Sequence, residues 1–318
     1  MPLDVLITGS SGFIGSRLAI RCNEAGMNVI ATSRTINKKI ELDIGLPLKK
    51  LDVLSTDLQY QEIEAEVILH TATANEFVSK DFIAGINLSV IGTRNILELA
   101  ARQGIRKVIF FSTVQVYGTE MNGEISEKSS VCCESSYALN HFMGEEVCRM
   151  FALKHGIDVV ILRPSNVYGV PDTQMINRPP LVPMSFVKEA KEEEKLKIRS
   201  SGLQRRNFIS NDEVADYCIE LLNNFPNGCE VINIVSNFTS SIKEVAEMTA
   251  KIFYQRMGKK LKIDFLSNEP LQSNNFILKT KLDSLKPTVK ESKKKFEEII
   301  WKLFINEQER TNIKNGQG

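Results

Sequence analysis

The stretch SSYALNHFMGEE, residues 135–146, places a tyrosine and a histidine four positions apart. Residues at this spacing lie on one face of a helix, so Tyr137 and His141 are expected to be neighbours. A tyrosine hydroxyl can move a proton, but with an ordinary pKa of about 10 it is a poor base at neutral pH. A histidine, with an ordinary pKa of about 6.5, is mostly uncharged at pH 7. The pair predicts proton transfer in which the histidine helps less than a permanent cation would.

Three glycines near the N-terminus, in DVLITGSSGFIGSRLAI, predict a phosphate-binding turn. Gly9, Gly12 and Gly15 follow a short apolar run and precede apolar residues at helical spacing. In a strand–turn–helix unit, one glycine permits the sharp turn, one lets a pyrophosphate approach, and one allows close packing of helix and strand. The helix N-terminus adds free N–H groups and the positive end of its dipole. A second predicted strand at 28–31 completes the context of a dinucleotide site.

The pair of residues that follows the second predicted strand bears on the choice between NAD and NADP. An acidic residue here would take the adenosine ribose hydroxyls of NAD, whereas this chain has Ser33 and Arg34. A carboxylate would repel the 2′-phosphate of NADP, but an arginine beside a hydroxyl can bind it. The alternative is a solvated arginine in a loop. The pair favours NADP, with NAD as the second choice.

The periodicity of the chain predicts an α/β fold with a doubly wound parallel sheet (Rossmann) and a smaller C-terminal α/β substrate lobe. Short apolar segments typical of buried strands occur at 4–7, 28–31, 67–71, 107–111, 158–162 and 230–234. We expect two domains. The NAD(P)-binding domain spans 1–165 and also receives 211–236, and the substrate-binding lobe comprises 166–210 and 237–318.

Two charged segments toward the C-terminus are predicted to be helical. The mixed charges of 188–200 indicate a solvated helix face. Residues 289–304 read as an amphipathic helix whose inward side consists of Phe296, Ile299, Ile300 and Phe304.

Composition excludes several classes of function. The 318 residues carry a formal net charge of +1, which gives no support to a nucleic-acid surface. No apolar run is long enough to cross a membrane, and no targeting segment is visible. Six cysteines without CxxC spacing indicate reduced thiols in a cytoplasmic protein, and no metal site is predicted.

These motifs together resemble the extended short-chain dehydrogenase/reductase family, the NAD(P)-dependent epimerase/dehydratase group. The resemblance covers most of the chain and is only loose from about residue 286 onward. It is carried by TGSSGFIG (8–15), VILHTAT (67–73), NLSVIGTRNILELA (87–100), VIFFSTVQVYG (108–118), ILRPSNVYG (161–169) and SSGLQRRNFISNDEVAD (200–216). His70, in the second of these, is expected to be a packed strand residue.

The resemblance implies a set of site residues. The catalytic residues would be Thr113, Tyr137 and His141. The cofactor would contact Gly9, Ser11, Gly12, Phe13, Ile14, Gly15, Ser33, Arg34, Asp43, Ile44, Thr71, Ala72, Thr73, Ser112, Tyr137, His141 and Pro164. The substrate would contact Thr113, Gln115, Asn166 and Arg206. A homodimer is also implied, because helices at 82–103 and 136–155 match those that form the family's intersubunit bundle.

His141 departs from the family, which has lysine at this position. Three interpretations stay open: a working substitute, a slow or reaction-restricted enzyme, and a protein that binds cofactor without turnover. Retention of Thr113, Tyr137 and the glycines argues against the last. Glu145, one turn further along, could pair with the imidazole and raise its pKa.

The implied reaction is an NAD(P)-dependent oxidoreduction or epimerisation at C4 of a nucleotide-activated sugar. Dehydratases of the family carry acidic residues after the catalytic Ser/Thr, where this chain has Val114 and Gln115, so a 4-ketoreductase or 4-epimerase is favoured. An arginine fork at Arg206 suits a diphosphate, although Arg205 next to it leaves the assignment open. Asn207 replaces the usual Asp. The alternatives are a reductase of a small lipophilic ketone and a non-catalytic NADP(H)-binding protein.

Overall fold

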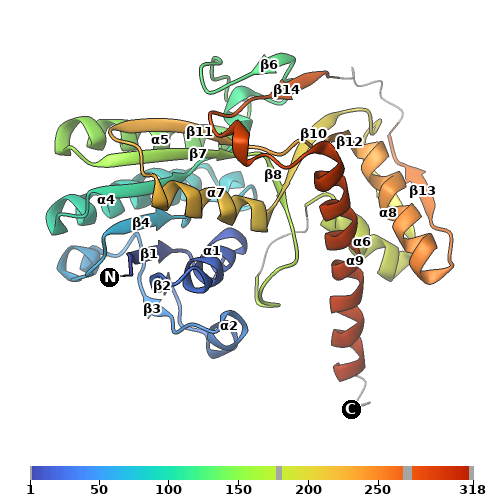
Figure 1. The fold of residues 1–318 in the computed structure, drawn as a ribbon, viewed down its shortest axis with the longest axis horizontal. Coiled ribbons are helices and arrows are strands. Elements are labelled where there is room, and N and C mark those ends of the chain that lie inside the picture. Colours follow the sequence, from blue (N-terminus) through green and yellow to red (C-terminus); the bar gives the residue numbers. More distant parts are fainter. Residues whose placement is uncertain (1, 177–180, 268–273, 315–318) are drawn as a thin grey trace.

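A computed structural model describes residues 2–176, 181–267 and 274–314, without side chains beyond 305. Its centre is a parallel sheet of seven strands in the order β11-β7-β5-β4-β1-β2-β3 (Figure 1). Along the chain these strands are β1 (Asp4–Thr8), β2 (Asn28–Ser33), β3 (Lys49–Lys50), β4 (Val67–His70), β5 (Lys107–Phe111), β7 (Asp158–Pro164) and β11 (Cys229–Ile234). The doubly wound parallel sheet expected from the sequence is therefore confirmed.

Helices cover both faces of this sheet, because its strands are apolar on both sides. One hydrophobic core lies under α1 (Phe13–Glu24), α2 (Lys38–Ile44) and α7 (Asn211–Asn223). A second core lies under α4 (Gly92–Gln103) and α5 (Ser136–His155) on the opposite face. A short α3 (Phe82–Ile86) and a π-helical turn (Asn87–Ile91) lead directly into α4.

The strand β3 was missed from the sequence. It has two residues, both exposed lysines, so it carries none of the apolar pattern on which strand prediction depends. The prediction of a helix over the charged segment 188–200 was also only half correct. Its first part completes α6 (Met184–Glu193), but its second part is β9 (Lys195–Ile198), whose alternating leucine and isoleucine are buried.

The second lobe is built around a third hydrophobic core. It contains a three-stranded sheet in the order β12-β10-β8 and the pair β13-β9, flanked by helices. The remaining elements of this lobe are β8 (Asn166–Tyr168), β10 (Arg205–Ser210), β12 (Thr239–Ser241), α8 (Ile242–Met257), β13 (Lys262–Phe265) and α9 (Val289–Lys314). The predicted inward residues of the terminal helix, Phe296, Ile299, Ile300 and Phe304, are all buried.

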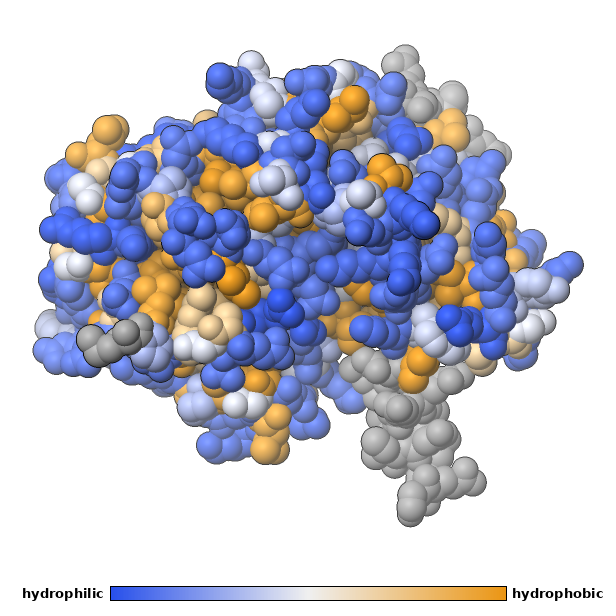
Figure 2. Space-filling view, in the orientation of Figure 1, coloured by the Kyte–Doolittle hydropathy of each residue, from blue (hydrophilic) through white to orange (hydrophobic). Residues whose placement is uncertain are grey.

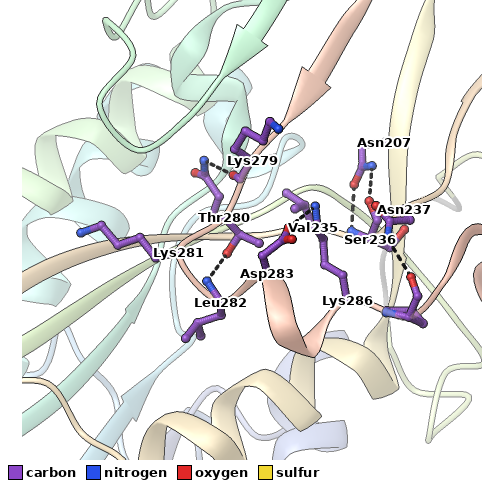
Figure 3. Close-up of polar contacts among 12 residues, drawn as sticks. Asn207, Val235, Ser236, Asn237, Lys279, Thr280, Lys281, Leu282, Asp283 and Lys286 are labelled. Carbon is purple, nitrogen blue, oxygen red and sulfur yellow. Dashed lines mark hydrogen bonds and ion pairs between the residues drawn. The ribbon is translucent and has the colours of Figure 1, made fainter.

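The chain crosses between the two lobes more than once. Since α7 and β11 pack with the seven-stranded sheet, they support the proposed return of 211–236 to the first domain. Strand β14 (Phe276–Leu278), which pairs with β6 (Gly123–Ile125), is followed by another crossing between the lobes at 279–288. Figure 3 shows this crossing beside residues 235–237, where Asn237 donates to the Pro287 carbonyl at 2.9 Å.

No described helix is both long and apolar enough to cross a membrane. The face drawn in Figure 2 carries mostly hydrophilic residues along its middle, where the two lobes meet.

Asn207 joins β10 to the turn that follows β11. Its Nδ2 donates to the Ser236 carbonyl at 2.8 Å and to Thr239 Oγ1 at 3.0 Å, while its Oδ1 accepts from the Ser236 backbone N–H at 3.2 Å (Figure 3). The side chain is 2% exposed. An ionised aspartate could not donate to the Ser236 carbonyl, so the family's usual residue would not fit this contact.

We therefore expect Asn207→Asp to lower the free energy of unfolding by about 3 kcal/mol at pH 7, because it leaves a buried charge facing a carbonyl. The deficit should shrink as the pH falls and the carboxyl takes up a proton. Urea unfolding at several pH values measures it. Asn237→Asp is the matched control: it also loses an amide that donates to a carbonyl, that of Pro287, but its carboxylate stays exposed to water, so it should cost no more than about 1 kcal/mol. Equal losses in the two variants would contradict the argument.

Candidate active site

The glycine turn after β1 has the geometry that a dinucleotide requires. Gly9 has φ +73°, which favours glycine. At Gly15 a Cβ would lie 2.3 Å from the Gly9 carbonyl oxygen, so only glycine lets α1 start this close to the turn. Gly12 caps α1 without a side chain, which leaves the first N–H groups of the helix facing outward. This is an anion-binding helix N-terminus.

A cavity of about 480 Å³ lies over this turn and beside the carboxyl ends of β1, β4 and β5. Twelve predicted residues line it: Gly9, Ser11, Gly12, Phe13, Ile14, Gly15, Arg34, Thr71, Thr73, Ser112, Tyr137 and His141. The lining residues that sequence reasoning missed are Thr35, Asn37, Ile40, Ala74, Asn75, Phe111, Met175 and Ile176. Phe111 ends β5, and Thr35, Asn37, Ala74 and Asn75 lie in the loops after β2 and β4, so their place at the carboxyl ends of strands was the available signal. Met175 and Ile176 carry no such signal.

Ser33 and Arg34 occupy different environments. Ser33 is 3% exposed, and its Oγ donates to Ser11 Oγ at 2.9 Å, so it is turned toward the glycine turn. Arg34 is exposed at the rim of the cavity. Of the two residues predicted to meet a 2′-phosphate, the arginine alone is placed at the opening.

Asp43 and Ile44 do not line the cavity. Both belong to α2, where Ile44 is buried in the core and Asp43 pairs with Lys39. The cofactor contact expected of these two residues is therefore not found at the cavity.

His141 is buried at the wall of the cavity. Its Nε2 donates to the Ala74 carbonyl at 3.1 Å, and Nδ1 has no hydrogen-bond partner among the described residues. Ala74 is itself held by Ser89 Oγ, on the π-helical turn, which accepts from its N–H at 2.9 Å. Burial lowers the pKa of His141, with the Ala74 carbonyl opposing the shift. The imidazole is therefore uncharged at neutral pH.

The suggested pairing of Glu145 with His141 is not found, although the charge of Glu145 acts in the expected direction and opposes the lowering of the pKa of His141. Glu145 is fully buried, and Arg163 donates to both of its oxygens, at 2.8 Å from Nε and 2.6 Å from Nη2. Ser112 Oγ donates to the same carboxylate at 2.6 Å. Because these donors occupy Glu145, it holds α5 against β5 and β7 and does not bond the imidazole.

Tyr137 and His141 are neighbours, as predicted. Their rings meet edge to face, with centroids 4.6 Å apart, at the start of α5. Gly144 lets this helix approach the sheet, since a Cβ there would lie 2.7 Å from Phe110 Cζ. Thr113 follows β5 and is buried, and its Oγ1 accepts from the Gln115 N–H at 3.2 Å.

His70 is a packed strand residue, as expected. It is 1% exposed and bonded through Nδ1 to Thr8 Oγ1 and through Nε2 to Thr93 Oγ1. Burial lowers the pKa of His70 to about 3. Thr8 Oγ1 also accepts from the Ala72 N–H at 3.3 Å, so Ala72 belongs to this packed wall and not to the cavity lining.

Two of the predicted substrate residues, Asn166 and Arg206, lie farther along, on the paired strands β8 and β10. Asn166 Nδ2 donates to the Asn207 carbonyl at 2.9 Å. Arg205 donates to the Thr239 carbonyl at 2.9 Å and pairs with Glu244 at 3.5 Å. Arg206 is half-buried, and no hydrogen bond or ion pair involves its guanidinium within the described residues. Burial lowers the pKa of Arg206. Of the two neighbouring arginines, Arg205 is the one with hydrogen-bond partners among the described residues, whereas Arg206 interacts with the charge of Glu120.

Thr113, Gln115, Pro164, Asn166 and Arg206 do not line the cavity over the glycine turn. None of the lining residues is acidic. Within the described ranges, no group of three or more His, Cys, Asp or Glu side chains is arranged to hold a metal ion.

In comparisons with known proteins, this chain is similar to proteins that are named for nucleotide sugars. The chain is 27% identical to dTDP-D-glucose 4,6-dehydratase of Mus musculus over 330 aligned positions, which span 95% of this chain and 90% of that protein. It is 31% identical to UDP-N-acetyl-alpha-D-glucosaminuronate decarboxylase of Bacillus cytotoxicus over 254 positions, 76% of this chain and 78% of the relative. The structure of UDP-glucuronic acid 4-epimerase from Bacillus cereus, in complex with UDP-glucuronic acid and NAD, superposes with a TM-score of 0.79 at 25% identity. That superposition covers 95% of this chain and 99% of the other.

The glycine turn, the tyrosine on α5 and the doubly wound sheet all lie within residues 5–234, which match the family model described as the NAD dependent epimerase/dehydratase family. The chain belongs to this family.

Proposed function

We propose that this protein is an NAD(P)-dependent enzyme that acts at C4 of a nucleotide-activated sugar, as a 4-epimerase or a 4-ketoreductase. The observation that carries the proposal is the placement of Tyr137 and His141 on the wall of a cavity whose floor is a glycine turn. The relatives' names support the substrate class, because each names a nucleotide sugar.

The residues fit a dinucleotide. The position of Gly15 tolerates no Cβ, and the first turn of α1 presents free N–H groups to a pyrophosphate. His141 Nδ1 is a buried acceptor without a partner among the described residues, and a ribose hydroxyl could donate to it. When bound, the nicotinamide supplies the site that takes or returns a hydride at the sugar carbon.

The protein's own residues supply the proton chemistry. Tyr137 takes the proton of the sugar hydroxyl as the C4–H bond breaks, and returns it when that bond forms again. Thr113 Oγ1 already accepts from a backbone N–H, so its own hydrogen is free to point at the substrate oxygen. His141 is uncharged, so the positive charge that favours the phenolate comes from outside the Tyr137–His141 pair.

Elimination of water is disfavoured. A 4,6-dehydratase needs an acid or base beside C5 and C6, and this chain has Val114 and Gln115 after Thr113.

The cofactor preference rests on Arg34. Its exposed position at the rim of the cavity supports NADP, whereas Ser33 is already engaged by Ser11. NAD is the alternative, and the Bacillus cereus epimerase was solved with NAD.

A panel of nucleotide sugars tests the reaction. The 4-hydroxy sugars are incubated with NAD or NADP and analysed for the C4 epimer, and the 4-keto sugars are incubated with NADH or NADPH and followed by cofactor oxidation. We expect turnover of at least one member, with NADP or NADPH preferred. Tyr137→Phe should lower this turnover by about 100-fold or more, because the proton carrier is removed. Bound cofactor with neither epimer nor reduced product, also with small ketones, would favour the non-catalytic alternative.

The two arginines separate the nucleotide sugar from a small lipophilic ketone. Arg206→Ala should raise KM for the nucleotide sugar by about tenfold or more, because the diphosphate of the substrate loses the guanidinium that would bind it. Arg205→Ala is the matched control, because Arg205 already has Thr239 and Glu244 as partners. A small ketone that is turned over equally well by both variants would overturn the substrate class.

The pH profile tests the role of His141. A lysine in its place brings a cation next to Tyr137, so His141→Lys should move the pH at which sugar oxidation rises down by about one unit. His141→Gln keeps an uncharged donor for Ala74 and should leave the profile unchanged. Because the folded-state pKa of His141 is lowered, the native enzyme should not gain activity as the pH falls through 6.5. Such a gain would show a charged imidazole.

We also propose a homodimer and a cytoplasmic location. The outer faces of the helices at 82–103 and 136–155 leave large apolar residues exposed, including Ile83 at 63% and Leu153 at 90%. Burial of Ile83 and Leu153 against a second copy of the chain would remove this apolar surface from water. A measurement of the mass of the native protein in solution checks the proposed dimer. The six free cysteines support a reducing compartment.

A further inference from the structure

The segment after β8 leaves the second lobe and returns to the sheet. In Figure 1 it is the yellow-green chain that runs down between the two lobes. Its described part, residues 170–176, lies between β8 and the residues that precede α6. We call it the strap. None of the sequence motifs covers it, and the proton chemistry above does not use it.

The first anchor of the strap is Asp172. Its carboxylate accepts from Ser16 Oγ at 2.9 Å and forms an ion pair with Arg17, and its side chain is only 4% exposed. Ser16 and Arg17 belong to the first turns of α1, directly after Gly15. The anchor therefore lies next to the helix N-terminus that faces the pyrophosphate.

The second anchor is Thr173, which is 1% exposed. Its Oγ1 donates to Asp43 Oδ2 on α2 at 2.7 Å and accepts from the Met175 N–H at 3.2 Å. This contact explains the position of Asp43, which was predicted to contact the cofactor. Asp43 instead holds the segment that passes over the site.

Between them, the anchors place two apolar residues at the cavity. Met175 and Ile176 line it together with Arg34 and Asn37, which form its rim after β2. A dinucleotide lying on the glycine turn would have these side chains against it.

We propose that the strap closes over the dinucleotide and holds it between turnovers, with Asp172 and Thr173 as its positioning residues. The proposal rests on the proposed function, since it assumes that the cavity takes NAD or NADP. The cofactor can leave only when residues 170–176 move, and their movement breaks the ion pair to Arg17 and the hydrogen bonds to Ser16 and Asp43. Each anchor thus slows release.

Retention distinguishes the two reactions left open above. A 4-epimerase removes a hydride from C4 and returns it to the same carbon, so the cofactor ends each turnover in its starting state. A 4-ketoreductase must release the oxidised cofactor after every hydride transfer and bind a reduced one. A strap that slows release therefore favours the 4-epimerase.

The test is the rate of cofactor release. The protein is loaded with NADH or NADPH, mixed with a large excess of the oxidised form, and followed by the loss of bound-cofactor fluorescence. We expect Asp172→Asn and Thr173→Val each to speed release by about tenfold, because each loses a buried hydrogen bond, with Asp172→Asn also losing a charge. Thr173→Ser keeps the hydroxyl and should restore the native rate.

The matched control is Asp212→Asn. Asp212, on α7, pairs with Arg17 at 3.5 Å but does not belong to the strap, so its removal should leave the release rate unchanged. Release that is equally fast in native protein and both strap variants, with thermal unfolding unaltered, would overturn the proposal. Should Asp172→Asn fail to fold, the comparison of Thr173→Val with Thr173→Ser decides.

The outcome is separable from the fate of the proposed function. Faster release from the strap variants, with no sugar nucleotide turned over by native protein, would support the strap and refute the C4 chemistry. Turnover of a sugar nucleotide by native protein, together with equal release rates in native protein and the strap variants, would support the C4 chemistry and refute the strap.

Discussion

The buried ion pair between Glu145 and Arg163 is the interaction on which the rest of the site depends. Two charges removed from water cost several kcal/mol each, and the cost is offset only when every lone pair and proton finds a partner. Arg163 donates to both oxygens of Glu145, Ser112 Oγ donates to one of them, and the Arg163 guanidinium lies 4.8 Å from the Tyr117 ring centroid. Such a network tolerates little displacement. It fixes α5, which carries the tyrosine, relative to β5, which leads to Thr113.

This arrangement has a cost for His141. A carboxylate one turn away could have kept the imidazole protonated, but Glu145 is already committed to Arg163. Burial then decides the charge, and the imidazole stays neutral. The position next to Tyr137 thus holds a neutral ring fixed by a backbone carbonyl. In the proposed reaction, the electrostatic help for proton transfer would have to come from outside this pair, and an oxidised nicotinamide would supply it.

The glycine turn and the sheet were predictable because the constraints on them are local. A strand, three glycines at fixed spacing and an amphipathic helix leave few other ways to satisfy the backbone. The same holds for Tyr137 and His141, whose proximity follows from helix geometry alone. The strand β3 could not be predicted in this way, because its two residues are exposed lysines and show no apolar pattern.

Other features depend on contacts between residues distant in the sequence, which no local pattern encodes. Asp172 meets Ser16 across 156 positions, and Thr173 meets Asp43 across 130. The choice between Arg205 and Arg206 was equally hidden, because both are arginines beside one strand and only their partners differ.

The cofactor and substrate sides of the site differ for the same reason. Pyrophosphate is recognised by backbone N–H groups, which every glycine turn of this kind presents alike. The proposed substrate residues Asn166 and Arg206 are side chains of the second lobe, and their placement depends on the chain crossings at 163–166, 210–211, 234–239 and 279–288. Asn207 illustrates the consequence. It departs from the family's aspartate at a crossing, where its amide donates to one carbonyl and accepts from a backbone N–H in the same turn. A substitution that looks like a change in the substrate site is therefore, in physical terms, a change in how the two lobes are joined.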